Sequence, residues 1–191
     1  GKSCESEEEI LLAFTAYLNG KNPRLVSFNG RSFDIPLILL RSLKYNIEIS
    51  AYFEKDNGAL NKTKWDNYRQ RYSEEFHTDL LDSLGNFGAA RGLRLDEVCK
   101  MANIPGKYEV SGDDVLELYK NGDFTRISEY CQSDCLNTYW LFLKYELLKG
   151  TLAKKDYQDI LKEFLTRLPQ EKSYTAVFAE ALMNEIGRVD E

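Results

Sequence analysis

The sequence predicts a helix-rich α/β domain with a small sheet, and three observations support this fold class. Apolar residues recur at helical spacing in several segments, the longest covering about residues 123–148. One short segment, Arg24–Phe28, favours a strand and is followed by the turn signal Asn29-Gly30. A chain of 191 residues, 43% of them hydrophobic, suits one folded domain or one domain with an appendage.

Helix signals divide most of the chain. Ser6, with Glu9 three residues later, forms a capping-box pattern before the first apolar-periodic run, and Asn19-Gly20 is a stop signal after it. Residues 54–76 are polar and irregular, which is unusual for so long a segment and typical of a functional loop. The expected helices cover about residues 7–18, 34–44, 93–102, 113–120, 123–148, 152–165 and 174–186.

The strand at Arg24–Phe28 needs a partner. His77–Asp82 is either a short strand or the entry to a helix. Because a strand alone cannot satisfy its own backbone groups, we expect either that its sheet partners are missing from this chain or that another molecule supplies them. An exposed sheet edge would also allow a homo-oligomer.

Composition excludes several classes of function. The net charge of −6 argues against holding nucleic acid by overall charge, although a local grip on a single strand is compatible with it. The four cysteines match no zinc pattern, and a single histidine excludes a histidine-based metal cluster. No apolar run reaches the ~20 residues of a membrane span, and no signal peptide precedes the first helix, so we predict a cytoplasmic location.

Two short segments carry residues suited to metal chemistry. In the first, the Asn29-Gly30 turn leads to a helix that begins with Asp34 in or beside its first turn; taken alone, Asp34 is more simply an N-cap. In the second, Tyr130 and Asp134 lie four residues apart and share one helix face, so a hydroxyl and a carboxylate reach one point in front of it. Taken alone, this pair is more simply a buried tyrosine with a solvated aspartate.

Taken together, the two segments resemble the DEDDy-type 3′–5′ exonucleases of the ribonuclease-H-like fold. That family's second motif is a strand ending in an N-x-x-F-D-type sequence, and its third motif is Y-x-x-x-D on a long helix. Here NGRSFDIP and YCQSDCLNTY match both. The resemblance runs from about Ser6 to Gly150 and favours the branch related to the exonuclease domain of family B DNA polymerases. The further segments that carry it are PRLVSFNG, NYRQRYS, HTDLLD, NIPGK and GDDVLELY.

The resemblance implies a two-metal site. In the family, four carboxylates hold two Mg²⁺ or Mn²⁺ ions roughly 3.5–4 Å apart, because these hard cations prefer oxygen ligands. Asp34 and Asp134 would be catalytic metal ligands, and Tyr130 would orient the attacking water. His77 and Asp79 would have a supporting role at most. The family's first motif, D-x-E, has no counterpart here and should lie upstream of the Ser6 helix, so we expect the ribonuclease-H-like fold without its first sheet strands.

Cations and aromatic residues alternate between Lys62 and Tyr72. Single strands are held by base stacking on aromatic rings together with phosphate contacts, so this segment is a candidate substrate grip. An equally good interpretation is a solvated loop whose rings pack on the core. The predicted nucleic-acid-binding residues are Asn29, Arg31, Trp65, Tyr68, Arg69 and Arg71.

We therefore predict a metal-dependent 3′–5′ exonuclease that hydrolyses 3′-terminal phosphodiesters, most simply in single-stranded DNA. Residues 1–150 would form the exonuclease domain, and residues 151–191 a helical extension packed on it. The alternative from another class is a catalytically inactive, nuclease-derived module that binds nucleic acid or a protein. A helical scaffold unrelated to nucleases is the third interpretation.

Overall fold

A computed structural model describes residues 4–106 and 112–189. The chain divides into two compact units, Gly1–Arg91 and Gly92–Glu191, and each is described by itself. The division does not coincide with the boundary predicted at residue 150, which stays a prediction. The NIPGK segment of the sequence ends at Lys107, which lies outside the described residues.

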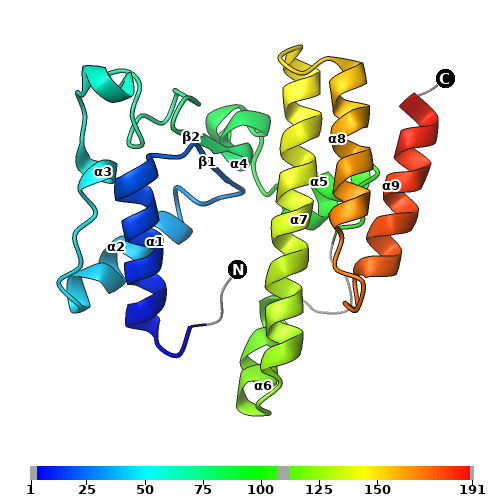
Figure 1. The fold of residues 1–191 in the computed structure, drawn as a ribbon, viewed down its shortest axis with the longest axis horizontal. Helices are drawn as coiled ribbons and strands as arrows, with labels where there is room; N and C mark the ends of the chain where they lie inside the picture. The colour runs from blue at the N-terminus through cyan, green and yellow to red at the C-terminus, as the bar shows by residue number, and fades with distance from the viewer. Residues whose placement is uncertain (1–3, 107–111, 190–191) are drawn as a thin grey trace. The chain divides into compact units, whose positions relative to one another are not determined.

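The first unit opens with α1 (Glu7–Lys21), whose start follows the predicted capping pattern (Figure 1). Ser6 Oγ accepts the backbone N–H of Glu9 at 3.1 Å, and the Glu9 carboxylate accepts the N–H of Glu5. The helix passes the predicted end and stops at Lys21, where Asn22 caps it in a left-handed conformation, φ 47°. The Asn19 side chain bonds outside its own helix, to the backbone at and just before α3 (Ser50–Phe53).

The predicted strand has a partner within the chain, which corrects the expectation that it lacks one. β1 (Leu25–Ser27) pairs in parallel with β2 (His77–Asp79), with Leu25 opposite His77 and Ser27 opposite Asp79. The segment that was ambiguous between strand and helix is both, because α4 (Leu80–Leu84) begins directly after β2. This small parallel sheet and the surrounding helices agree with an α/β domain.

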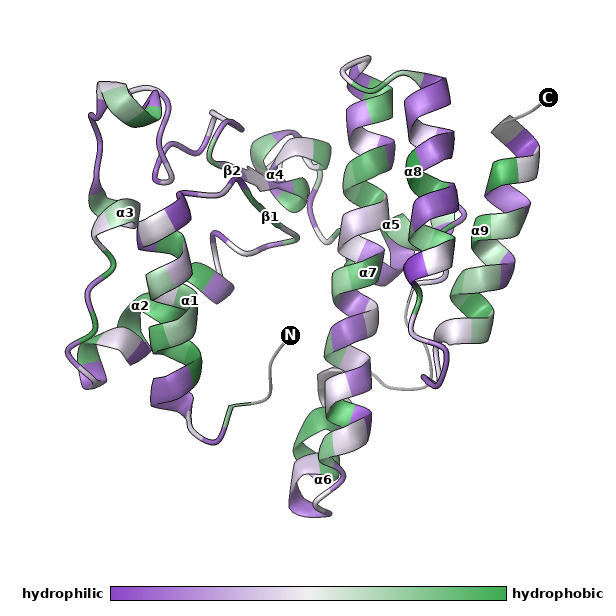
Figure 2. Ribbon diagram, in the orientation of Figure 1, coloured by the Kyte–Doolittle hydropathy of each residue, from purple (hydrophilic) through white to green (hydrophobic). Residues whose placement is uncertain are grey.

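The connection between β1 and β2 contains the second predicted helix, with the predicted bounds. α2 (Asp34–Lys44) is followed by α3, and the short η1 (Gly58–Leu60) lies in the otherwise irregular loop. Figure 2 shows apolar stretches along α2, and three of its leucines are exposed on the surface: Leu37, Leu40 and Leu43.

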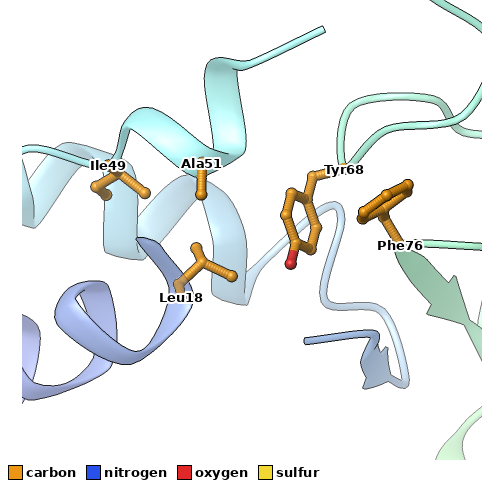
Figure 3. Close-up of a cluster of buried hydrophobic side chains, with 5 residues drawn as sticks. All are labelled: Leu18, Ile49, Ala51, Tyr68 and Phe76. Carbon is orange, nitrogen blue, oxygen red and sulfur yellow. The ribbon is translucent and has the colours of Figure 1, made fainter. Parts of the chain in front are cut away.

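The core of the first unit gathers residues from α1, the α3 region and the irregular loop (Figure 3). Leu18, Ile49, Ala51, Tyr68 and Phe76 are buried together, and the Tyr68 and Phe76 rings meet edge to face at 5.3 Å. Burial of such rings supplies a large share of the apolar area that a small unit removes from water. The loop thus contributes to the core rather than standing free in solvent.

The described secondary-structure elements of the second unit are all helices. The last element of the first unit is the short η2 (Asn86–Gly88). The second unit then contains α5 (Leu95–Met101), η3 (Gly112–Asp114), α6 (Val115–Lys120), α7 (Phe124–Lys149), α8 (Lys154–Arg167) and α9 (Thr175–Val189).

Helix α7 forms the long axis of the second unit, and α8 packs against it (Figure 1). Asp123 caps its start by accepting the N–H of Arg126, and Gly150 ends it in a left-handed conformation, φ 74°. Trp140 on α7 donates its ring N–H to the Tyr157 hydroxyl of α8 at 3.0 Å, so buried polar groups also join the two helices. In residues 4–106 and 112–189, no helix is long and apolar enough to cross a membrane; the cytoplasmic location stays a prediction.

Candidate active site

The turn after β1 carries the first predicted metal ligand. Asn29 adopts a left-handed conformation, φ 71°, and Gly30 follows it where the chain folds back tightly. A Cβ on Gly30 would lie 2.4 Å from Ser27 Oγ, closer than real atoms approach, so the turn requires glycine. The N-cap of α2 is Phe33, and no side chain caps that end; Asp34 is therefore not an N-cap, and its side chain is exposed.

A carboxylate on β2 holds this turn in place. Asp79, 3% exposed, accepts the backbone N–H of Asn29 with Oδ1 and that of Arg31 with Oδ2, both at 2.8 Å. It also caps α4 by accepting the N–H of Leu81 at 3.1 Å. Three N–H donors thus occupy the Asp79 carboxylate, which makes it a structural anchor for the segment that leads to Asp34.

Arg31, which is half-buried, also ties this turn to the loop before β2 and to β2 itself. Its guanidinium donates to the backbone carbonyls of Tyr68 at 3.0 Å and His77 at 2.7 Å. Burial lowers the pKa of Arg31, while the carboxylates of Asp79 and Asp82 act in the opposite direction. Two of its three guanidinium nitrogens thus donate inside the unit, and the contact of Arg31 with nucleic acid stays a prediction.

His77 is buried and neutral. Its pKa is lowered to about 4, mainly because burial disfavours the charged imidazole and also because the Arg31 cation lies nearby. Its Nε2 lies 2.8 Å from Ser27 Oγ, across the β1–β2 pair. The sequence analysis predicts a supporting role at most for His77 and Asp79, and the structure places them at the start and the end of β2, beside β1 and the turn that follows it.

Tyr130 and Asp134 share one face of α7 and are half-buried. The Tyr130 hydroxyl lies beside Gly112, 3.6 Å from the position that a Cβ would take there. Burial raises the pKa of the Cys99 thiol to about 12, and the negative charge of Asp134 acts in the same direction. Asp134 therefore lies near α5, at the buried side of the long helix.

Asn137, one turn beyond Asp134, is a site residue that the motif analysis missed. It is fully buried, donates to the Gly106 carbonyl at 2.7 Å and accepts the Gly106 N–H at 3.2 Å. This double hydrogen bond fastens the Ile104–Gly106 turn to α7. The signal in the sequence was an asparagine three residues after Asp134, within the YCQSDCLNTY segment.

The donor chemistry of the two predicted ligands fits a hard divalent ion, because both offer carboxylate oxygens. Asp34 belongs to the first unit and Asp134 to the second, so their meeting in one cleft stays a prediction. Among the described residues, no three histidine, cysteine, aspartate or glutamate side chains gather closely enough to hold a metal ion.

Part of the Lys62–Tyr72 segment, predicted to hold the substrate, is buried in the core, and part is exposed on the surface. The Tyr68 ring is fully buried and its hydroxyl donates to the Pro23 carbonyl, so the prediction that Tyr68 stacks on bases is corrected. Lys62 is buried too, with its ammonium donating to the Ala51 carbonyl and to Glu54. Both side chains are buried because they pack against Phe76 and the α3 region.

Other residues of this segment remain accessible. Trp65 is 69% exposed, and the Lys64 ammonium lies 4.9 Å from its ring centre. The Arg69 guanidinium lies 5.5 Å from the ring centre of Phe53. Arg71 is paired with Asp82, which raises the pKa of Arg71 and accepts hydrogen bonds from its guanidinium group. A cation beside an accessible aromatic ring is a suitable surface for a nucleotide.

Comparison with known proteins completes the description of the site. No solved structure matches the chain. The DNA polymerase catalytic subunit of Elephantid herpesvirus 1 (isolate Asian elephant/Berlin/Kiba/1998) is 25% identical over 151 residues. This match covers 74% of the present chain and 14% of the viral protein, so the chain spans a small part of that relative's length.

A family model for the predicted 3′–5′ exonucleases related to the exonuclease domain of PolB matches residues 1–182. The match confirms the family predicted from the two motifs. It also extends past Gly150, where the motif resemblance ended, into the last two helices. The chain therefore belongs to the family of predicted 3′–5′ exonucleases related to the exonuclease domain of PolB.

Proposed function

We propose that the protein is a metal-dependent 3′–5′ exonuclease acting on single-stranded nucleic acid, with DNA as the substrate we favour. The observation that carries the proposal is the exposed Asp34 carboxylate. It follows a tightly held turn, does not cap its helix, and belongs to the NGRSFDIP segment, whose resemblance to the second exonuclease motif implies a ligand there. Membership of the family supports the reaction class.

In this proposal, Asp34 and Asp134 would hold Mg²⁺ or Mn²⁺, which when bound would make water more acidic and stabilise negative charge on the leaving oxygen. The Tyr130 hydroxyl orients the attacking water by a hydrogen bond. Water adds to the terminal phosphorus, the bond from phosphorus to the 3′-oxygen of the preceding nucleotide breaks, and that oxygen takes up a proton. The product is a 5′-mononucleotide.

The same proposal assigns the grip on the single strand to Trp65, with Lys64 and Arg69 as phosphate partners. Trp65 is exposed, and each of the two cations lies beside an aromatic ring. Stacking on one ring tolerates any base, which suits an exonuclease that works along a strand. Asn29 stays a proposed contact because its side chain stands at the turn before Asp34.

The experiment is a cleavage assay with a 3′-labelled single strand, with and without Mg²⁺ or Mn²⁺. We expect metal-dependent release of the terminal nucleotide, lost in Asp34→Asn and in Asp134→Asn. Asp159→Asn is the matched control, because Asp159 is an exposed carboxylate on α8 whose partner is the neighbouring Lys162. DNA and RNA strands of one sequence, compared in parallel, identify the preferred sugar.

The second candidate is a nuclease-derived module that binds nucleic acid or a protein without cleaving it. The described residues lack a cluster of three potential metal ligands, and this observation favours it. Binding of the single strand without cleavage, in a protein that carries every family motif, would support this module and contradict the exonuclease. Metal-dependent cleavage that Asp134→Asn abolishes would exclude it.

A further inference from the structure

The segment that precedes α9 is hydrogen-bonded to α7 beside the third-motif tyrosine, Tyr130. The carboxylate of Glu129, one residue before Tyr130, accepts the backbone N–H of Ser173 at 3.1 Å and the Ser173 hydroxyl at 2.6 Å. The Lys172 ammonium also donates to Glu129, at 3.3 Å. Hydrogen bonds from Ser173 and Lys172 lower the pKa of the Glu129 carboxyl, so it is ionised at neutral pH.

A second contact reaches a residue inside the helical turn 130–134, here called the motif turn. The hydroxyl of Tyr174, a residue only 2% exposed, donates to Gln132 Oε1 at 2.8 Å. The Gln132 amide nitrogen donates in turn to Ser128 Oγ at 2.9 Å, which keeps the amide oxygen directed at Tyr174. Because Gln132 lies between Tyr130 and Asp134, this contact acts on the motif turn itself.

The two contacts hold α7 from the side away from the motif. An α-helix rotates by about 100° per residue, so Glu129 and Gln132, three residues apart, share one face. The face that carries Tyr130 and Asp134 lies roughly 150° further around the helix. A support on the first face therefore fixes the rotation of α7 about its axis without occupying the face that carries the motif.

The far end of α9 is fastened as well, which makes the segment before it a fixed support. Glu185 on α9, 7% exposed, accepts hydrogen bonds from the Lys144 ammonium of α7 and, at 3.1 Å, from the Tyr157 hydroxyl of α8. Buried charge-assisted hydrogen bonds of this kind hold their elements in one arrangement. The family match reaches residue 182, so residues 172–174 lie inside the matched region.

We propose that residues 172–174 position the motif turn of α7, and that Glu129 and Gln132 are the positioning residues through which they act. The catalytic part of this proposal rests on the proposed function. A misplacement of about 1 Å can cost a reaction roughly 100-fold in rate, so the helix that carries a water-orienting hydroxyl and a metal ligand gains from such a support. The last two helices thereby serve the site as well as extending the domain.

Amide hydrogen exchange tests the support without any cleavage. Tyr174→Phe keeps the ring and removes only the hydroxyl that holds Gln132, so exchange at residues 130–134 should accelerate about 10-fold relative to the rest of α7. Tyr157→Phe is the matched control, because it removes a buried tyrosine hydroxyl that bonds α9 at its other end. Unchanged exchange at residues 130–134 in Tyr174→Phe, or the same local acceleration in Tyr157→Phe, would overturn the proposal.

Cleavage kinetics test the catalytic part. We expect Tyr174→Phe and Glu129→Gln to lower kcat about 10-fold with KM unchanged, because both act on the placement of catalytic groups and neither is proposed to contact the substrate. Tyr157→Phe should keep the wild-type kcat and KM. Wild-type kcat in both test variants, despite accelerated exchange, would reduce the support to a structural role and overturn the proposal. If the wild-type protein does not cleave, the proposed function fails, and exchange still decides whether residues 172–174 hold the motif turn.

Discussion

The Asp79 carboxylate accepts the backbone N–H of Arg31 at 2.8 Å, so a side chain of β2 fixes the turn that follows β1. The contact spans nearly fifty residues of sequence and joins the two strands at their carboxyl ends. The candidate ligand Asp34 lies three residues after Arg31 and is the first residue of α2. The backbone conformation of the turn that leads to Asp34 thus depends on the Asp79 carboxylate, whose role is structural.

Replacing this anchor should loosen the turn before it affects the rest of the unit. In Asp79→Asn, an amide group takes the place of one carboxylate oxygen and opposes a backbone N–H. We expect about 2 kcal/mol less unfolding free energy, typical for hydrogen bonds to a charged group that is buried. Amide exchange at Asn29 and Arg31 should accelerate most. Asp56→Asn, at an exposed carboxylate, is the control, and equal exchange in both variants would contradict the anchor role.

The buried His77 should make the protein less stable in mild acid. Its folded pKa of about 4 lies below the ordinary value of 6.5, so the unfolded chain takes up the proton first. The corresponding stability is present above pH 6.5 and is lost as the pH falls towards 4, about 3 kcal/mol in all. Urea unfolding at pH 7.5 and pH 5 measures it. His77→Gln should flatten this pH dependence, and an identical pH dependence in both proteins would contradict the assignment.

Tyr130→Phe should slow cleavage without preventing metal binding. The hydroxyl is proposed to orient a water molecule, a partial contribution to the rate of on the order of 10²–10³-fold. Single-turnover cleavage and Mn²⁺ titration of the same variant separate the two effects. Tyr139→Phe, at an exposed tyrosine on the same helix, serves as the control. Wild-type cleavage by Tyr130→Phe would remove the hydroxyl from the mechanism.

Trp65→Ala should weaken binding of a single strand by about 5-fold or more, because stacking on one ring contributes roughly 1–3 kcal/mol per base. Fluorescence anisotropy with a labelled oligonucleotide measures it at two salt concentrations. Tyr17→Ala is the matched control, since Tyr17 is an exposed aromatic on α1, outside the segment. The buried Tyr68 should affect stability rather than affinity. Equal affinities of Trp65→Ala and the wild type for the single strand would contradict the proposal that Trp65 binds it.

The exposed leucines of α2 and the edge of the small sheet should promote self-association. Leu40 and Leu43, three residues apart on α2, are 66% and 74% exposed, and neighbouring exposed apolar side chains favour a partner. Sedimentation velocity over a range of concentrations should show a concentration-dependent mass, reduced in Leu40→Lys. Leu148→Lys, at a 77% exposed leucine on α7, is the control. A monomer at every concentration tested would contradict the proposed homo-oligomer.

Local signals in the sequence determined much of the helical structure. The capping pattern at Ser6 and the ends of α7 at Asp123 and Gly150 follow from interactions within a few residues, so the chain carries them wherever it folds. The two motifs and their spacing likewise predicted the family, because each is a contiguous stretch of sequence.

Only the tertiary structure decided which side chains serve the core and which the site. Tyr68 and Lys62 are buried and Arg31 is turned inward, because residues distant in sequence supply their partners. β1 finds β2 across fifty residues, a pairing that no local propensity encodes. Ser27, His77 and Asp79 approach the turn before Asp34 for the same reason: hydrogen bonds between strands depend on register, and register is set by the packing of the whole unit.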